Sequence, residues 1–424
     1  MASLTSSIPL VALALSIGSL GTLAPKFLLS TPCPGAGDGD AALHAPLFAA
    51  LCVFLASTLC LLVPLRAALQ GGQPLPSPAA LLARARPLAA PAAAAAIGTV
   101  LQLASLLLLP AAVLAGLRGL FILWTAQLSQ RLALKDAPGS AAEWRCIYAC
   151  CAGALCVGAG AVAAAAAGGG GGGGDGEGGS AATVALLGGA GGAAAVGVLL
   201  SALGYAAASA QVALEQVLLD GSYSRWEVLG GEGALSALLT LGALGALQAA
   251  FAAQAPAGAR SGQGLWGSLD VPAHTLACAA SAAAVPAWAA AYGAVGLTFN
   301  ALLLTLAQAM GPNMRVLVFT ARGVLTWGVE VALYYAGGAL GVRGTPLTPY
   351  SALELAGFGA LVWGGALRAQ RVSEREAAGK GSGGGAGVAG AGAGAGAAEE
   401  GGAGSSSSSS SSSEEEGLGE RLLK

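Results

Sequence analysis

Residues 87–128 read PLAAPAAAAAIGTVLQLASLLLLPAAVLAGLRGLFILWTAQL, and Arg118 is the single charged residue in this stretch. A helix that crosses the roughly 30 Å of bilayer hydrocarbon needs about 20 apolar residues, because each residue advances the helix by about 1.5 Å. Pro110 lies near the middle and favours a tight hairpin, because proline interrupts a helix. The stretch therefore predicts two successive membrane-spanning helices.

The same length criterion, applied outward from this stretch, predicts an all-α membrane protein with about ten transmembrane helices. Each further run is mostly apolar and close to the required length. The predicted spans are 6–24, 46–65, 87–108, 110–128, 144–166, 194–217, 228–252, 286–307, 312–336 and 350–367.

The composition excludes several classes of protein. Hydrophobic residues make up 55% of the chain and charged residues 9%, whereas soluble proteins have about a quarter charged. A formal net charge of −2 leaves no basic surface for nucleic acid. No convergent nucleophile, base or metal-ligand set lies inside the spans, so we expect neither an enzyme nor a cofactor or metal. The eight cysteines lie mostly in apolar runs and imply no disulfide framework.

The distribution of lysine and arginine predicts the orientation in the membrane. With the N-terminus in the cytoplasm, most of the 19 basic residues fall in cytoplasmic segments, whereas Lys26, Arg260 and Arg343 fall outside. Cytoplasmic loops are enriched in basic residues, so both termini are expected to be cytoplasmic. Lys26 ends the first span, and we expect it to extend to the interface.

Two similar arginine motifs divide the chain into halves. Leu117-Arg118-Gly119 lies in the fourth span, and Ala321-Arg322-Gly323 lies in the ninth. Five helices per half is an odd number, which predicts two inverted five-helix repeats, an architecture of secondary transporters. The predicted segments are a first repeat at 1–166, a Gly/Ala-rich linker at 167–193, a second repeat at 194–373, and a disordered Gly/Ser/Glu-rich cytoplasmic tail at 374–424.

Arg118 and Arg322 are the first candidate site residues. A charged side chain at mid-membrane depth costs about 2.5 to 3.5 kcal/mol or more, so it normally faces a partner or a watery cavity. The arginines could attract an anionic solute group, or pair with intramembrane carboxylates such as Glu215, Glu232 or Glu330. Asn300 in the eighth span must also find partners, and solute contact and interhelical bonding both remain open.

These residues resemble a known family, the drug/metabolite transporter superfamily, and within it the F-type branch of solute carrier family 35, which is nucleotide-sugar-transporter-like. The first span is similar to a Gly-Ser-x-Asn-Thr-Leu-x-x-Lys pattern of that branch. Later islands of similarity extend to the ninth span and to the acidic dileucine-like C-terminus. The matching residues are Gly18-Ser19, Thr22-Leu23, Lys26, Gln211, Leu214-Glu215, Gly231-Glu232-Gly233, Asn300, Arg315, Arg322, Trp327 and Glu420-Arg421-Leu422-Leu423.

The resemblance implies a multi-pass transporter of an endomembrane, either lysosome or vacuole or Golgi, that moves a small polar or anionic organic solute by alternating access. The residues expected to bind the solute are Arg118, Arg322, Asn300, Glu232 and Gln211. The expected partners are the lipid bilayer, the solute and a second copy of the chain, but no nucleic acid. The alternative is a non-transporting membrane adaptor that acts through its acidic C-terminal tail.

Overall fold

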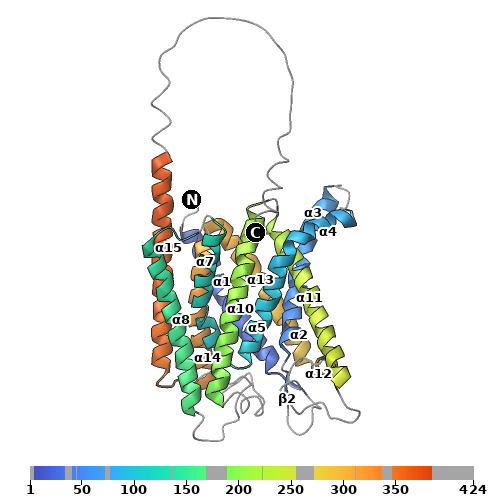
Figure 1. Ribbon diagram of the computed structural model, residues 1–424. Coiled ribbons are helices and arrows are strands. Elements are labelled where there is room, and N and C mark those ends of the chain that lie inside the picture. The colour runs from blue at the N-terminus through green and yellow to red at the C-terminus, as the bar shows by residue number, and fades with distance from the viewer. Residues whose placement is uncertain are drawn as a thin grey trace, which may run out of the picture. The chain divides into compact units, whose positions relative to one another are not determined.

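A computed structural model of the chain is helical throughout its described part, apart from one pair of two-residue strands (Figure 1). The chain divides into a unit of residues Met1–Arg375, which holds the site described below, and a second unit of residues Glu376–Lys424. The described residues are 4–33, 41–43, 45–71, 77–134, 137–168, 189–221, 223–254, 272–310, 312–336 and 346–383.

The first half of the chain forms five helical stretches, three of which are composed of shorter pieces. Strands β1 (Pro32–Cys33) and β2 (Ala41–Ala42) pair antiparallel between the first two stretches. The helices are α1 (Leu4–Leu29), α2 (Pro46–Thr58), η1 (Leu59–Leu61), α3 (Leu62–Gln70), α4 (Pro78–Ala85), η2 (Arg86–Leu88), α5 (Ala89–Leu106), α6 (Ala111–Gly116), α7 (Gly119–Arg131) and α8 (Ala141–Gly168).

The second half consists of longer, mostly continuous helices. They are α10 (Ala190–Leu219), α11 (Arg225–Gln254), α12 (Pro272–Ser281), α13 (Ala284–Met310), α14 (Pro312–Tyr335) and α15 (Ser351–Gly383). The long helices of both halves run alongside one another (Figure 1).

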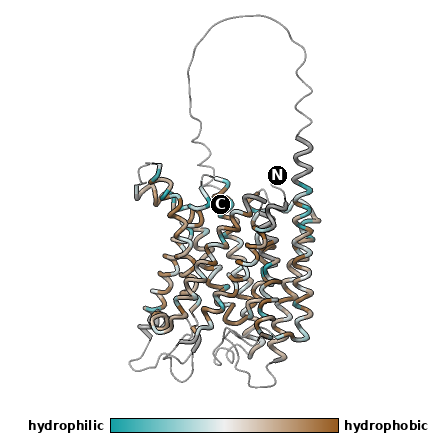
Figure 2. Tube along the Cα trace, turned by 180° about the vertical axis from the view of Figure 1, so that it is seen from behind, coloured by the Kyte–Doolittle hydropathy of each residue, from teal (hydrophilic) through white to brown (hydrophobic). Residues whose placement is uncertain are grey.

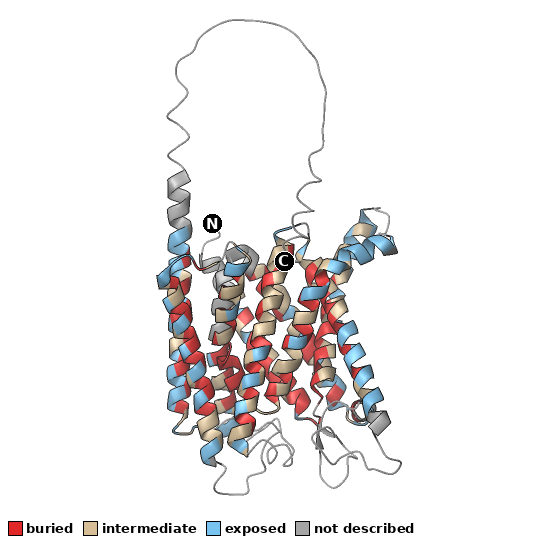
Figure 3. Ribbon diagram, viewed as in Figure 1, coloured by how far each residue is buried: buried red, intermediate tan, exposed pale blue. Residues whose placement is uncertain are grey.

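The prediction of a multi-pass helical membrane protein is confirmed. Within the described residues, eight helical stretches are long and apolar enough to cross a membrane, from Pro9–Leu29 to Ala284–Leu306. The helices α14 and α15, with 24 and 33 residues, follow these eight. Apolar residues dominate the bundle (Figure 2), and exposed leucines such as Leu238 and Leu241 occur on α11, where exposed residues mark the outward face (Figure 3). Such faces suit contact with lipid.

Helices of the first half of the chain pack on helices of the second half. From the first half, α1 contacts α13 and α14, and from the second half, α10 contacts α5 and α7. Likewise α2 contacts α13, whereas α11 contacts α5. The contacts of α2 with α11 and of α6 with α14 join helices at the same place in each half.

Glycines let two of these helices approach closely. The helices α8 and α15 cross at Gly153 and Gly357, where a Cβ atom on either glycine would lie 2.5 Å from the carbonyl oxygen of the other. No side chain fits at that distance, so small residues set the separation of the helices. Gly119 of α7 also allows a close backbone approach, because a Cβ atom there would lie 2.5 Å from the carbonyl oxygen of Cys150.

The structure corrects the expected boundaries at three places. The fourth span is interrupted at Leu117 and Arg118, where the amides of Leu120 and Phe121 donate to carbonyls three residues earlier. The segment before α13 forms the separate helix α12. The last helix continues to Gly383, beyond the expected start of the tail at Glu374, and residues 384–424 lie outside the described part.

A fourth correction concerns the cysteines. Cys278 on α12 is disulfide-bonded, contrary to the expectation of no disulfide framework. The other described cysteine side chains are free, and four of these six are buried among helices as expected. In the sequence, a free cysteine in an apolar run cannot be distinguished from a disulfide-bonded one, because the bonding partner is distant along the chain.

Candidate functional site

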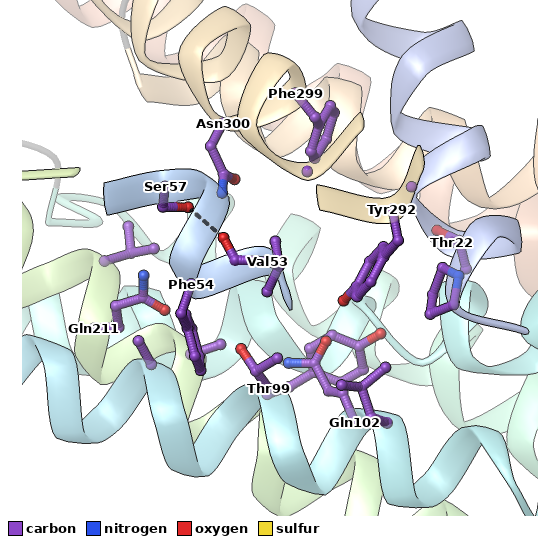
Figure 4. A pocket seen from close by; sticks show the side chains of 18 of the residues that line it. Thr22, Val53, Phe54, Ser57, Thr99, Gln102, Gln211, Tyr292, Phe299 and Asn300 are labelled. Carbon is purple, nitrogen blue, oxygen red and sulfur yellow. Dashed lines mark hydrogen bonds between the residues drawn. The ribbon is translucent and has the colours of Figure 1, made fainter. Parts of the chain in front are cut away.

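A cavity of about 220 Å³ lies among the helices of the first unit and brings together all five residues predicted to bind a solute. Both halves contribute to its lining, from α1 to α14. Figure 4 shows Gln211 on one side of the cavity, Thr22 on the other, and Asn300 and Phe299 on the helix between them. The five residues are Arg118, Gln211, Glu232, Asn300 and Arg322.

Arg118 is buried at the interruption between α6 and α7. Its Nε donates to the hydroxyl oxygen of Tyr205 at 3.2 Å, and its Nη2 donates to Oγ1 of Thr22 at 3.4 Å. The Tyr205 hydroxyl in turn donates to the carbonyl of Leu114 at 2.5 Å. These contacts fix the guanidinium between α1 and α10, so its position on the cavity is defined by three helices.

Arg322 is buried on the continuous helix α14. Its guanidinium carbon lies 4.5 Å from the centre of the Phe299 ring, which is a cation–π distance. Its side chain also passes Gly18 of α1, where a Cβ atom would lie 3.0 Å from Cδ of Arg322. Arg118 therefore reaches the cavity from a break in its helix, whereas Arg322 reaches the same cavity from an intact helix.

A cluster of acidic and amide groups forms another part of the cavity wall. Nε2 of Gln211 donates to Oε1 of Glu215 at 2.7 Å and to Oε1 of Glu232 at 2.5 Å. Both glutamates are buried, and Glu232 and Gln211 line the cavity. Because the amide nitrogen is directed at the two carboxylates, the carbonyl oxygen of Gln211 is directed away from them and remains an acceptor.

Aromatic and neutral polar side chains complete the wall. Asn300 is half-buried on α13, and Tyr292 and Phe299 of the same helix also line the cavity. Sequence reasoning missed Tyr205 and Tyr292 as lining residues. The available signal was a polar-tipped aromatic residue inside an apolar span, because a buried phenol needs a hydrogen-bond partner.

A second group of buried charges stabilises a helix junction. Nζ of Lys26 lies 2.9 Å from Oε1 of Glu330, which is 1% exposed. The amides of Ala111 and Ala112 also donate to the two oxygens of Glu330, at 3.2 and 2.9 Å. The prediction that Lys26 extends to the membrane interface is wrong, because its ammonium group pairs with the buried carboxylate of Glu330.

No known family model matches the chain, and no curated protein matches it. The resemblance to the drug/metabolite transporters therefore stays a prediction. Two parts of that resemblance, the Arg315 side chain and the C-terminal residues 420–423, lie outside the described residues.

Proposed function

We propose that this protein is a secondary transporter of the drug/metabolite type that moves a small polar or anionic organic solute by alternating access. The observation that carries the proposal is the cavity itself. Two buried arginines, a buried glutamate and two amide side chains from five helices line one space of about 220 Å³. Charged groups inside a membrane bundle are expensive to bury, and they mark solute or ion pathways.

The packing of the halves supports two inverted repeats. In two such repeats, α10 corresponds to α1, α5 to α13, and the α6–α7 stretch to α14. The contacts of α1 with α13 and α14 then predict contacts of α10 with α5 and with the α6–α7 stretch. The observed neighbours of α10 include α5 and α7. Repeats related in this way place the solute site at their interface and move against each other during transport.

The break in the helix at Arg118 also supports transport. The amides that follow the break form tighter, three-residue turns at Leu120 and Phe121. Such turns inside a helix often mark a hinge, and discontinuous helices commonly form solute sites in transporters. Arg118 thus lies where a small rotation of α6 against α7 changes the shape of the cavity.

Two independent features support an orientation with a cytoplasmic N-terminus. The basic residues Arg84 and Arg86 lie on α4 and η2, at the same end of the bundle as the N-terminus (Figure 1). The disulfide-bonded Cys278 lies on α12, at the opposite end. Basic residues favour the cytoplasmic side and disulfides favour an oxidising compartment, so an endomembrane lumen or the cell exterior fits the α12 end.

A melting screen tests the proposal. Detergent-purified protein is heated with nucleotide sugars, nucleotides, amino acids and phosphorylated metabolites, because a ligand that binds the folded state raises its melting temperature. The expected result is a shift that is lost in Arg118→Ala and Arg322→Ala. Arg371→Ala is the control, because Arg371 makes an exposed ion pair with Glu374 and lies away from the cavity lining.

Two results would contradict the proposal. If a ligand shifts the wild type and both arginine variants equally, the cavity is not its site. If no compound shifts the wild type, while removal of residues 384–424 abolishes the cellular function, the adaptor alternative replaces the transporter.

A further inference from the structure

We infer that the solute is a small zwitterion with an apolar body, comparable in chemistry to an α-amino acid. The inference rests on the proposed transport function and narrows its solute class. It depends on opposite charges being held at different parts of one cavity wall, and on the apolar side chains that share this wall.

The cationic part of the wall is formed by Arg118 and Arg322. Arg118 is anchored by Tyr205 and Thr22, and Arg322 lies over Phe299. Both guanidinium groups are held by contacts from several helices rather than by flexible loops. A guanidinium has five N–H donors in a planar fork, which suits a carboxylate with two acceptor oxygens.

The anionic part of the wall is formed by Glu232 and by the acceptor oxygen of Gln211. Glu232 is 4% exposed, and it shares the Gln211 amide nitrogen with the buried Glu215. The two glutamates orient the Gln211 side chain, whose carbonyl oxygen is then available as an acceptor. An ammonium group has three donors and a positive charge, which suits this combination of carboxylate and carbonyl oxygens.

The two parts lie apart from each other. In Figure 4, Gln211 lies on one side of the cavity and Thr22, the hydrogen-bond partner of Arg118, lies on the other. The lining holds two arginines and one glutamate, and a second buried glutamate, Glu215, lies behind it in contact with Gln211, so the wall and its support together have no formal excess of either sign. A solute with one charge of each sign therefore complements the wall better than an anion or a cation alone.

The remaining wall selects a small, partly apolar body. Phe54, Phe121, Leu103 and Val212 also line the cavity. Its volume of about 220 Å³ lies below the roughly 300 to 1,000 Å³ of pockets that hold drug-sized ligands. An amino acid fits this scale, whereas a nucleotide sugar is much larger.

The test compares compounds that share a body but differ in charge. The probes are leucine and phenylalanine, their N-acetyl derivatives, which lack the cationic amine, and their amides, which lack the carboxylate. Binding is measured from the shift in melting temperature as the concentration of each compound is raised. We expect each free amino acid to bind at least about tenfold more tightly than either derivative, because each derivative loses one charged contact.

Two variants that each remove one charge assign the contacts. Glu232→Gln keeps the hydrogen-bonding shape but removes the negative charge, so its preference for leucine over N-acetyl-leucine should fall towards one. Arg322→Gln should instead reduce the preference for leucine over leucinamide. The melting temperature of each variant without ligand checks that it folds, and Arg371→Ala should keep both preferences.

Each outcome decides between the alternatives. If N-acetyl-leucine or leucinamide binds as tightly as leucine, the zwitterion inference is wrong. If these probes fail but a nucleotide sugar or phosphorylated metabolite gives a shift that depends on Arg322, the inference fails and the transport proposal stands. If no compound of either panel gives a shift, both fail.

Discussion

Two groups of buried charges in this protein use the same residue types in different ways. At the junction of α1, α6 and α14, Glu330 accepts from Lys26 and from the amides of Ala111 and Ala112 within a packed site. Around the cavity, Arg118, Arg322 and Glu232 are equally buried but line a space. The comparison teaches that burial of a charge does not by itself indicate a function, because a charge can also hold helices together.

Replacing Glu330 should produce the largest loss of stability. Glu330→Ala leaves the Lys26 ammonium and two helix N-terminal amides without their acceptor, and breaking a buried pair this way costs about 3 to 5 kcal/mol. Denaturant unfolding in detergent measures the change. Glu374→Ala is the control, because Glu374 pairs with Arg371 at 3.2 Å on the surface, where a pair contributes about 0 to 1 kcal/mol.

A loss below about 1 kcal/mol in Glu330→Ala would remove the contrast between the junction and a surface pair. The double variant Lys26→Met/Glu330→Gln sharpens the test, since it leaves no uncompensated ion. It should be more stable than Glu330→Ala.

The crossing of α8 and α15 at their glycines shows how much stability depends on a helix contact without charges. Gly153→Ala should cost about 1 to 3 kcal/mol, because the new Cβ overlaps the carbonyl oxygen of Gly357 and the helices must separate. Gly242→Ala is the control, since nothing lies within 4 Å of the position of its Cβ. It should be neutral or stabilising by up to about 1 kcal/mol. If Gly153→Ala were as stable as Gly242→Ala, the close approach at Gly153 and Gly357 would not limit the packing of the two helices, which would contradict this account.

Replacing Arg322 should change stability less than it changes ligand binding. Its identified cation–π contact with Phe299 contributes about 0.5 to 2 kcal/mol, so Arg322→Ala should lose about that amount of stability. The ligand-induced melting shift should nevertheless disappear. A loss of stability as large as that of Glu330→Ala would place Arg322 among the junction residues and end the distinction between the two groups.

Removing residues 384–424 should have the smallest effect. The segment is rich in glycine, serine and glutamate, a composition that cannot bury an apolar core. We expect the unfolding free energy to change by less than about 0.5 kcal/mol and the ligand shift to remain. A lost ligand shift in the truncated protein would show that the tail contributes to the site.

Within the described residues, eight of the ten spans predicted from the sequence correspond to helices long and apolar enough to cross a membrane, because the bilayer imposes their length and hydropathy. The sequence also points to Arg118 and Arg322 as cavity residues, since a charge in an apolar span needs a polar partner or a watery cavity. It does not predict that Lys26 pairs with Glu330, because the two residues are 304 positions apart. It likewise does not predict the contacts of Arg118 with Tyr205 and Thr22, which lie 87 and 96 positions away along the chain.

The most direct test of the central claim is counterflow in proteoliposomes, with the compound that gives the largest melting shift. Vesicles loaded with unlabelled compound are exposed to its labelled form, and uptake is compared for the wild type, Arg118→Ala, Arg322→Ala and Arg371→Ala. We predict uptake by the wild type and Arg371→Ala, and a loss on the order of 100-fold in both cavity variants. Equal uptake by the wild type and the two cavity variants would contradict the assignment of this cavity as the transport site.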